Sequence, residues 1–278
     1  MECPHCQSSA ITERPERTEL GYQRFCCRTC ESGFNERTGT FFNRLQYPTD
    51  VVCLVILWRI RYKLSLRDLA EMFLERGVIF THEAVREWEA KLAPVLSETL
   101  RKHRRGRVGR SWYCDETYLK VKGCWTYLYR AIDRDGNLVD VYLSETRDRA
   151  AAEAFFRSAR TVTEIVPDRV TTDGHSSYPG AIKAELGETV LHRTNRYLNN
   201  HLEQDHRGIK QRTHSMCGFK SFMSAERFCR VYDEVRAFFR ARSQRNEAVS
   251  LGLQRVLHVG RMRVLMGSLA VASMLITW

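Results

Sequence analysis

The stretch from residue 108 to residue 215 alternates between strand and helix signals, which constrains the fold more than any other feature. Three segments rich in aromatic and β-branched side chains come first, at residues 112–122, 125–132 and 138–143. Turn signals containing glycine separate them, which predicts an antiparallel meander. Helix and short strand signals then alternate, at residues 149–160, 169–172, 179–186 and 190–192. This order predicts an α/β domain with a mixed sheet.

Three carboxylates stand out within this stretch. Asp115 sits in the middle of an apolar strand, where a carboxylate is costly to bury unless it is paired or binds a metal. Asp173 follows a strand, at the edge where α/β folds place ligands. Glu203 lies about one turn into a helix expected from residue 198 to about residue 212. Carboxylates from separate elements can hold two divalent cations for phosphoryl transfer, and their hard oxygens select Mg²⁺ or Mn²⁺.

Lys210 is a further candidate for the same site. It lies seven residues after Glu203, so the two share a helix face, and its ammonium group could hold a phosphate beside the metals. The alternative for each acid is a surface residue or a helix cap. That alternative is weak for Asp115 but strong for Glu203 taken alone, because Glu185 and Glu188 compete with it.

Two C-x2-C pairs, separated by 20 residues, dominate the first 44 residues: Cys3, Cys6, Cys27 and Cys30. Four thiolates at this spacing predict one tetrahedral zinc. The polar segment between the pairs is too short to build a core, so the metal would supply the missing folding energy. His5 and Cys26 remain alternative ligands. Unrelated structural cysteines are the competing interpretation.

Residues 45–105 carry helix signals. We expect helices at 50–62, 66–75 and 82–92, capped by Thr49, Ser65 and Thr81. The last two are near the size of a helix-turn-helix, whose second helix enters the major groove. An ordinary helical hairpin explains them equally well, because three glutamates on the second helix do not favour DNA.

A basic segment follows at residues 101–110, with six Lys or Arg residues and two glycines, and it is predicted to be a mobile linker. The DNA-contact candidates come from this segment and from the start of the preceding helix: His82, Arg86, Arg104, Arg105, Arg107 and Arg110. The formal net charge of +11 favours a polyanionic partner such as nucleic acid, although a merely soluble basic protein has the same balance.

The two ends of the chain bear on compartment. No apolar leader follows Met1, so we expect a cytosolic chain with reduced thiols. The apolar run at residues 264–278 has 15 residues without a charge, whereas a membrane-spanning helix needs about 20. We expect it to be a packed C-terminal helix or an atypical terminus, and no membrane association.

Several motifs in a fixed order resemble the transposases of small bacterial insertion sequences. They are DETYLKVKG at 115–123, YLYRAID at 127–133, Thr172-Asp173 with Ser177-Tyr178, NNHLEQDHR at 199–207 and GFKS at 218–221. The similarity is greatest to the sixth insertion-sequence family, with its integrase-like DDE domain, and covers residues 45–245. The spacing of 30 residues between Asp173 and Glu203 is shorter than usual for the family, and many members lack the cysteine pairs.

The resemblance implies a ribonuclease-H-like fold with a catalytic triad of Asp115, Asp173 and Glu203, and it matches Lys210 to a basic residue after the triad. It also implies two catalytic Mg²⁺ or Mn²⁺ ions, and a homodimer or larger assembly on terminal inverted repeats and target DNA. The expected location is the bacterial cytoplasm, at the nucleoid.

Four domains are expected: a zinc ribbon at 1–44, a helix-turn-helix region at 45–105, a DDE catalytic domain at 106–245 and a helical tail at 246–278. The predicted function is to bind insertion-sequence ends, free a 3′-hydroxyl and join it to target DNA. The alternative is a zinc-ribbon and helix-turn-helix regulator without catalysis, but a regulator does not need three carboxylates and a lysine at these positions. A nuclease of the same fold is a third candidate, but it has no need of modules that recognise element ends.

Overall fold

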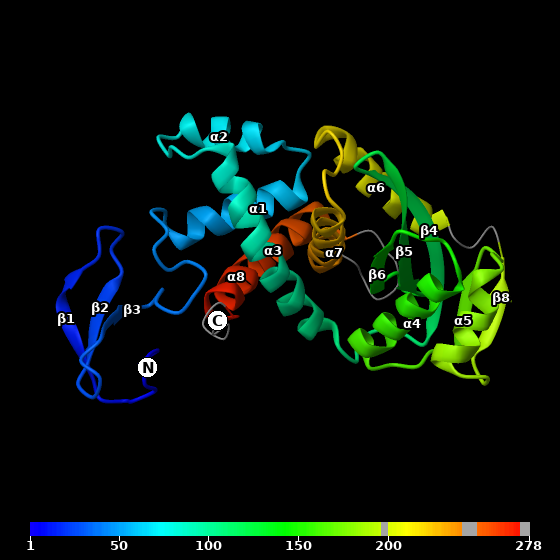
Figure 1. The fold of residues 1–278 in the computed structure, drawn as a ribbon, viewed down its shortest axis with the longest axis horizontal. Helices are drawn as coiled ribbons and strands as arrows, with labels where there is room; N and C mark the ends of the chain where they lie inside the picture. Colours follow the sequence, from blue (N-terminus) through cyan, green and yellow to red (C-terminus); the bar gives the residue numbers. More distant parts are fainter. Residues whose placement is uncertain (196–199, 241–248, 273–278) are drawn as a thin grey trace.

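The computed structural model describes residues 1–195, 200–240 and 249–272, apart from the side chains of residues 200, 201, 203–205 and 270–272. Figure 1 shows a small strand unit at one end, a group of helices in the middle and a larger sheet at the other end. The small unit is an antiparallel sheet of β1 (Ile11–Arg17), β2 (Gln23–Cys27) and β3 (Gly33–Asn35). Its buried apolar side chains are only those of Cys3, Cys27 and Phe34.

Three helices follow: α1 (Thr49–Arg61), α2 (Leu66–Leu74) and α3 (His82–Arg104). The predicted caps of α2 and α3 are confirmed, since Ser65 forms a capping box and Thr81 accepts a hydrogen bond from the backbone N–H of Ala84. The predicted cap Thr49 is wrong, because Thr49 is already the first helical residue. Its hydroxyl and its backbone N–H both bond to the hydroxyl of Tyr22, which ties the small sheet to α1.

The larger sheet has the order β6-β5-β4-β7-β8. Its strands are β4 (Ser111–Val121), β5 (Cys124–Asp133), β6 (Leu138–Ser144), β7 (Arg169–Thr172) and β8 (Leu191–Thr194). The first three in chain order are antiparallel, while β7 runs parallel to β4 and β8 parallel to β7. The predicted meander and mixed sheet are confirmed, and the strand order is the ribonuclease-H-like one.

Helices cover both faces of this sheet (Figure 1). On one face, α4 (Arg149–Thr163) and α5 (Ser177–Leu186) pack on the buried rings of Trp112 and Tyr129. On the other, α7 (Phe222–Phe239) packs against β6, and α6 (Asn200–Ser215) lies beside β4. The strand residues on this second face, among them Leu119 and Leu128, join the core that α7 completes.

The last described helix is α8 (Leu251–Ala272), which confirms a helical segment before the C-terminus. It packs against α1, α3 and α7, and the side chains of Leu265 and Leu269 are buried. Residues 246–248 and 273–278 of the expected tail lie outside the described residues. In the described ranges, none of the helices combines the length and apolar character needed to cross a membrane.

The middle helices and the larger sheet share one hydrophobic core. Ile56 of α1, Leu92 of α3, Leu128 of β5 and Val235 of α7 are all fully or almost fully buried within it. The core therefore continues across the domain boundary expected near residue 105. Because the elements on both sides of the boundary share this core, we expect them to unfold together.

The prediction of a mobile linker from residue 101 is wrong for its first four residues, which complete α3. Arg101 donates to Asp140 of β6 at 2.6 Å, and Arg104 donates to both oxygens of Glu234 in α7 at 2.7 and 2.9 Å. The two carboxylate side chains are 0% and 1% exposed. Three residues apart, the two arginines share a helix face, and that face meets two buried carboxylates supplied by distant segments.

We expect Glu234→Ala to lower the free energy of unfolding by about 3–5 kcal/mol, because it removes the carboxylate that binds the largely buried Arg104 through two hydrogen bonds and leaves Arg101 with Asp140 alone. Arg105→Ala is the matched control. It breaks the exposed Arg105–Glu164 pair, which spans 3.3 Å, and should cost less than about 1 kcal/mol. Urea denaturation of both variants measures the difference. A loss of under about 1 kcal/mol for Glu234→Ala would show that the junction between α3 and α7 contributes little.

Candidate active site

The pairing of β4 with β7 brings two of the predicted carboxylates together. Tyr113 lies opposite Thr171 in this parallel pair, so Asp115 and Asp173, two residues further along each chain, end up side by side. Carboxylate oxygens of Asp115, Asp173 and the neighbouring Glu116 all lie within 4.8 Å of one another. A group of hard oxygen donors this close together fits divalent cations such as Mg²⁺ or Mn²⁺.

Asp115 faces α6, where a buried histidine approaches it. The Nδ1 atom of His206 is 3.8 Å from Oδ2 of Asp115. Burial, aided by the charges of Arg130 and Lys210, lowers the pKa of His206 to about 3. The ring is therefore neutral at neutral pH, and it contacts the carboxylate as a dipole and not as a cation.

Lys210 lies on the same helix, one turn further on. Its Nζ atom is 4.3 Å from the centre of the Tyr118 ring, which belongs to β4 three residues beyond Asp115. Lys210 is exposed, so its ammonium group is free to approach a phosphate from solvent. The structure thus places Lys210 along the strand that carries Asp115.

Asp173 begins the loop after β7, and its neighbour Gly174 shapes that loop. Gly174 has φ +94°, and a Cβ atom there would come within 2.5 Å of Thr194 Cγ2 on β8. Only glycine combines this backbone angle with such a close approach. The loop also lets the backbone N–H of His175 donate to Oδ1 of Asp173 at 3.0 Å, while the Asp173 side chain stays 35% exposed. The carboxylate is oriented and still accessible.

Glu116 is a site residue that the sequence analysis missed. Its side chain is 4% exposed and points to the α5 face, where it accepts hydrogen bonds from Tyr178 and Arg147. Burial together with the Glu116 carboxylate raises the pKa of Tyr178, which therefore stays a neutral donor. Arg147 also approaches Asp173, with Nη2 to Oδ2 at 3.9 Å. Burial opposes the charge of Arg147, but Glu116 outweighs burial and raises the pKa of Arg147.

The third predicted triad member, Glu203, is in α6 as expected from its sequence position. The side chain of Glu203 lies outside the described residues. Its role therefore stays a prediction.

The four predicted zinc ligands come together in the small sheet. The Sγ atoms of Cys3 and Cys30 are 3.6 Å apart and those of Cys6 and Cys27 are 3.5 Å apart. All four lie within 4.8 Å of one another, close to the spacing of about 3.8 Å that a Zn–S distance of about 2.3 Å gives in a tetrahedral site.

Within this cysteine cluster the backbone favours the thiolate of Cys27, whereas at Cys6 a backbone hydrogen bond from Ser8 is outweighed by burial and by the neighbouring thiols, which raise the pKa of Cys6 to about 12. Hydrogen bonds from the backbone of Cys30 and Thr29 lower the pKa of Cys27 to about 6. The alternative ligands are not part of the cluster in the described structure. His5 is exposed, and Cys26 instead donates to the carbonyl of Glu31.

The predicted DNA-contact residues fall into two groups. His82 and Arg86 at the start of α3 both pair with Glu83, and Arg105 and Arg110 form exposed pairs with Glu164 and Asp168. Exposed pairs of this kind are weak, so a phosphate can replace the carboxylate. Arg104 differs, because its guanidinium is committed to Glu234 and is 14% exposed. Arg107 is exposed.

Residues 109–242 match a family model described as a DDE domain, DDE_Tnp_IS240. The transposase for insertion sequence-like element IS431mec of Staphylococcus aureus strain N315 is 40% identical over 177 residues, which cover 62% of this chain and 78% of that protein. The Staphylococcus aureus transposase of IS257 in transposon Tn4003 is 39% identical over the same coverage. This chain belongs to the DDE transposase family of these insertion sequences.

The HTLV-2 integrase catalytic core domain, solved in complex with magnesium, is similar to this chain with a TM-score of 0.37 and 13% identity, over 55% of this chain and 99% of that one. The family match confirms the resemblance to the sixth insertion-sequence family. The matched DDE domain contains Asp115 and Asp173, the two acids that the sheet register brings together.

Proposed function

We propose that this transposase cuts DNA at the ends of an insertion sequence and joins the freed 3′-hydroxyl to target DNA, with Asp115, Asp173 and Glu203 as its catalytic carboxylates. One observation carries the assignment: in a chain of the DDE family, Asp115 and Asp173 approach each other from adjacent parallel strands. A regulator without catalysis would have no use for carboxylates held this close together, because their mutual repulsion is unfavourable without a cation.

The three carboxylates would hold two Mg²⁺ or Mn²⁺ ions. When bound, such a pair activates the attacking oxygen and stabilises the leaving oxygen of an in-line displacement at phosphorus. Arg147 forms an ion pair with Glu116 and also lies 3.9 Å from Asp173, so its positive charge offsets part of the negative charge of the site. His206, neutral and buried, lies 3.8 Å from Asp115 and does not act as a general acid.

Two displacements would use the same carboxylates in turn. In the first, a water oxygen bonds to phosphorus at the element end, and the bond to the 3′-oxygen breaks. In the second, the oxygen of that 3′-hydroxyl bonds to the phosphorus of a target phosphodiester, and the bond to the 3′-oxygen of the target strand breaks. Lys210, exposed beside β4, would hold a phosphate during both. No bond between protein and DNA is needed, so Tyr118 and Tyr178 serve in packing and hydrogen bonding.

The partner would be DNA at the terminal inverted repeats and at the target, in the bacterial nucleoid. Joining two ends needs at least two active sites, so we propose a dimer or larger assembly on DNA. The cysteine cluster would hold one structural zinc, because a closed four-thiolate site leaves no position for a substrate. It would serve folding of the small sheet and its docking on DNA.

The test is to incubate the full-length protein and Mg²⁺ with a duplex that carries one labelled element end and a separate target duplex. We expect a nick with a free 3′-hydroxyl, followed by transfer of the label to the target. All label should leave the protein on denaturation. Label that stays on the protein, or cleavage that never leads to joining, would contradict the proposal.

A further inference from the structure

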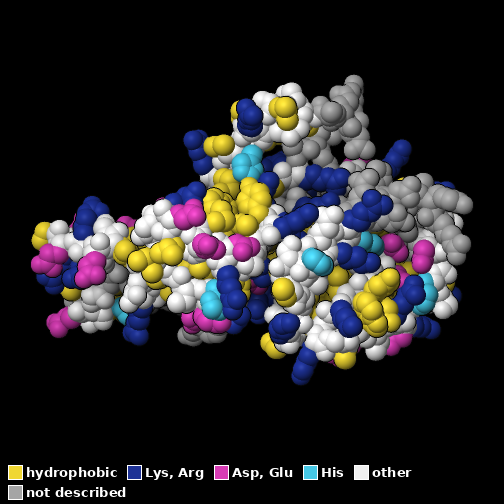
Figure 2. Space-filling model, turned by 90° about the horizontal axis from the view of Figure 1, so that it is seen from above, with side chains coloured by type: hydrophobic (Ala, Val, Ile, Leu, Met, Phe, Trp, Pro, Cys, Tyr) yellow, Lys and Arg dark blue, Asp and Glu magenta, His cyan; other side chains and the backbone are white. Residues whose placement is uncertain are grey.

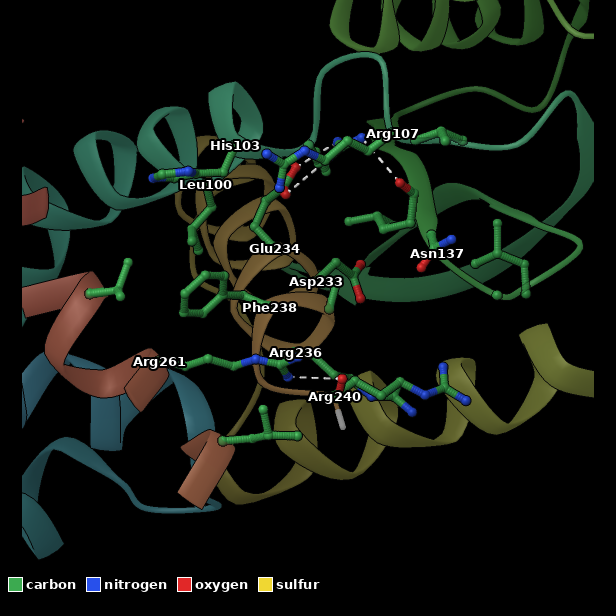
Figure 3. A pocket seen from close by; sticks show the side chains of 18 of the residues that line it. Leu100, His103, Arg107, Asn137, Asp233, Glu234, Arg236, Phe238, Arg240 and Arg261 are labelled. Atoms are coloured by element: carbon green, nitrogen blue, oxygen red, sulfur yellow. Dashed lines mark hydrogen bonds and ion pairs between the residues drawn. The ribbon is translucent and has the colours of Figure 1, made fainter. Parts of the chain in front are cut away.

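A cavity of about 800 Å³ lies where α3, the turn between β5 and β6, α7 and α8 meet (Figure 3). This volume falls within the range of about 300–1,000 Å³ typical of pockets that bury a ligand the size of a drug. It is large enough for a nucleotide or two and too small for a duplex to enter. The proposed reaction does not use it.

Basic side chains set the charge of this cavity. Its two acids, Asp233 and Glu234, are already matched by arginines. Asp233 binds Nη2 of Arg130 with both oxygens at 2.6 Å, and Glu234 binds Arg101 and Arg104. The remaining charged side chains of the lining are all arginines: Arg107, Arg236, Arg240 and Arg261. The wall is therefore positive overall and suits an anion.

Arg107 and Arg261 are the clearest anion-binding candidates. Within the described part of the chain, no carboxylate forms an ion pair with either of them. Arg261 donates from Nη1 to the neutral carbonyl of Arg240 at 2.9 Å, and burial lowers the pKa of Arg261. A partly desolvated guanidinium without a carboxylate gains free energy when an anion binds.

An aromatic ring lies among these cations. Figure 3 shows Phe238 projecting from α7 between Leu100 and Arg261. The ring is half-buried, so part of its surface faces the cavity. Arginines that contact phosphates, next to an aromatic ring on which a base can stack, are the features with which proteins bind single-stranded nucleic acid. A small anion such as free phosphate would leave the apolar wall unused.

The cavity and the candidate active site lie on opposite sides of one ion pair. Asp233 lines the cavity and binds Arg130, and Arg130 lies directly opposite Asp115 in the β4–β5 pair. The two sites are therefore separated by one buried ion pair. Figure 2 shows Lys and Arg side chains gathered over the middle of one face of the molecule, and a basic surface of this kind suits DNA.

We propose that this cavity binds one or two unpaired nucleotides of the DNA substrate, with phosphates on Arg107 and Arg261 and a base on Phe238. The proposal rests on the proposed function, since DNA is its substrate, and it adds a site for a strand that is displaced at the cut end.

The experiment measures binding of a short fluorescein-labelled oligothymidylate to the full chain by anisotropy, in EDTA, over a series of salt concentrations. Each phosphate contact contributes about 0.7 to the slope of log affinity against log salt for single strands. Arg107→Ala with Arg261→Ala should therefore reduce the slope by about 1.4. Phe238→Leu should weaken binding about 5-fold or more while leaving the slope unchanged. Arg107→Ala alone, at an exposed position, should remove about 0.7 of the slope without affecting folding.

Arg169→Ala is the matched control, because Arg169 is exposed at the start of β7 and outside the cavity. Its slope should equal that of the unmodified chain, and thermal melting should show that all variants are folded. Equal slopes for Arg107→Ala and the control would overturn the proposal, as would an equal loss of affinity for a blunt duplex. Binding in EDTA requires no cleavage, so a chain that never nicks DNA but loses its slope in these variants would fail only the proposed function.

Discussion

Asp115→Asn is expected to lower the rate of strand cleavage by about 10³-fold or more, equal to about 4 kcal/mol of transition-state stabilisation. The substitution keeps the shape of the side chain and removes the charge that would hold a divalent cation beside Asp173. Asp173→Asn should have an effect of the same size. A nicking assay on labelled end DNA in Mg²⁺ measures the rates, and binding of the same DNA in EDTA should change less than about 3-fold because these acids make no phosphate contact.

Glu116→Gln is the matched comparison, because Glu116 is the next residue on the same strand and its oxygens are equally close. Tyr178 and Arg147 already occupy the Glu116 carboxylate. Glu116 should therefore position the site without holding a cation, so the loss of rate should be smaller, about 10–100-fold. If Glu116→Gln abolished cleavage and Glu203→Gln did not, Glu116 would be the third catalytic carboxylate. A loss of DNA binding together with cleavage in Asp115→Asn would assign Asp115 a folding role instead.

How much of this site is predictable depends on whether the signal is local. Asp115 is found because a carboxylate in an apolar strand is rare, and Asp173 because it ends a strand. The parallel register that joins them follows from the predicted fold. The local sequence does not single out Arg147 or Tyr178, because an arginine in a loop and a tyrosine near the start of a helix are both common. The Asp-Glu pair within an apolar strand is the one signal that could have identified Glu116.

The helices and strands were predictable from periodicity, but the packing of the helical region against the larger sheet was not. Residues 101–110 have the composition of a solvated linker, and composition alone favours mobility. The carboxylates that fix Arg101 and Arg104 come from Asp140 and Glu234, up to 133 residues away in the chain. No local sequence pattern predicts that these arginines pair with those two carboxylates. For the same reason the sequence suggested separable modules, whereas α3 and α7 share a core and buried ion pairs.

Two adjacent acids of α7 connect the helical region to the candidate active site. The side chains of Glu234 and Asp233 are adjacent in α7, one bound to α3 and the other to Arg130, which lies opposite Asp115. A fragment that starts near Arg107 would lose α1 and α3 from the shared core and expose the partners of Arg101 and Arg104. Such a fragment should fail to fold, so point variants and not truncations are the suitable test of end recognition.

Removing the metal from the cysteine cluster should unfold the small sheet while leaving the rest of the chain folded. The apolar side chains buried in the core of the small sheet are only those of Cys3, Cys27 and Phe34, and so small a core cannot offset the conformational entropy of about 40 residues. Metal analysis should find one zinc per chain. On treatment with a strong chelator, residues 1–44 should become sensitive to protease, while the main melting transition, which reports the core shared by α1, α3, α7 and the large sheet, should remain.

Cys26 and Cys27 are adjacent in the chain but differ in their surroundings, so they provide a matched pair of variants for testing the zinc ligands. Cys27 is fully buried within 3.5 Å of Cys6 Sγ, whereas the Cys26 side chain turns away to the carbonyl of Glu31. Cys27→Ser should lower the zinc content well below one per chain and reproduce the effect of the chelator, because a serine hydroxyl is not a thiolate ligand. Cys26→Ser makes the same chemical change one residue away and should keep the full zinc content. A Cys27→Ser protein that still carried one zinc, or a Cys26→Ser protein that lost it, would show that the ligand set is not Cys3, Cys6, Cys27 and Cys30.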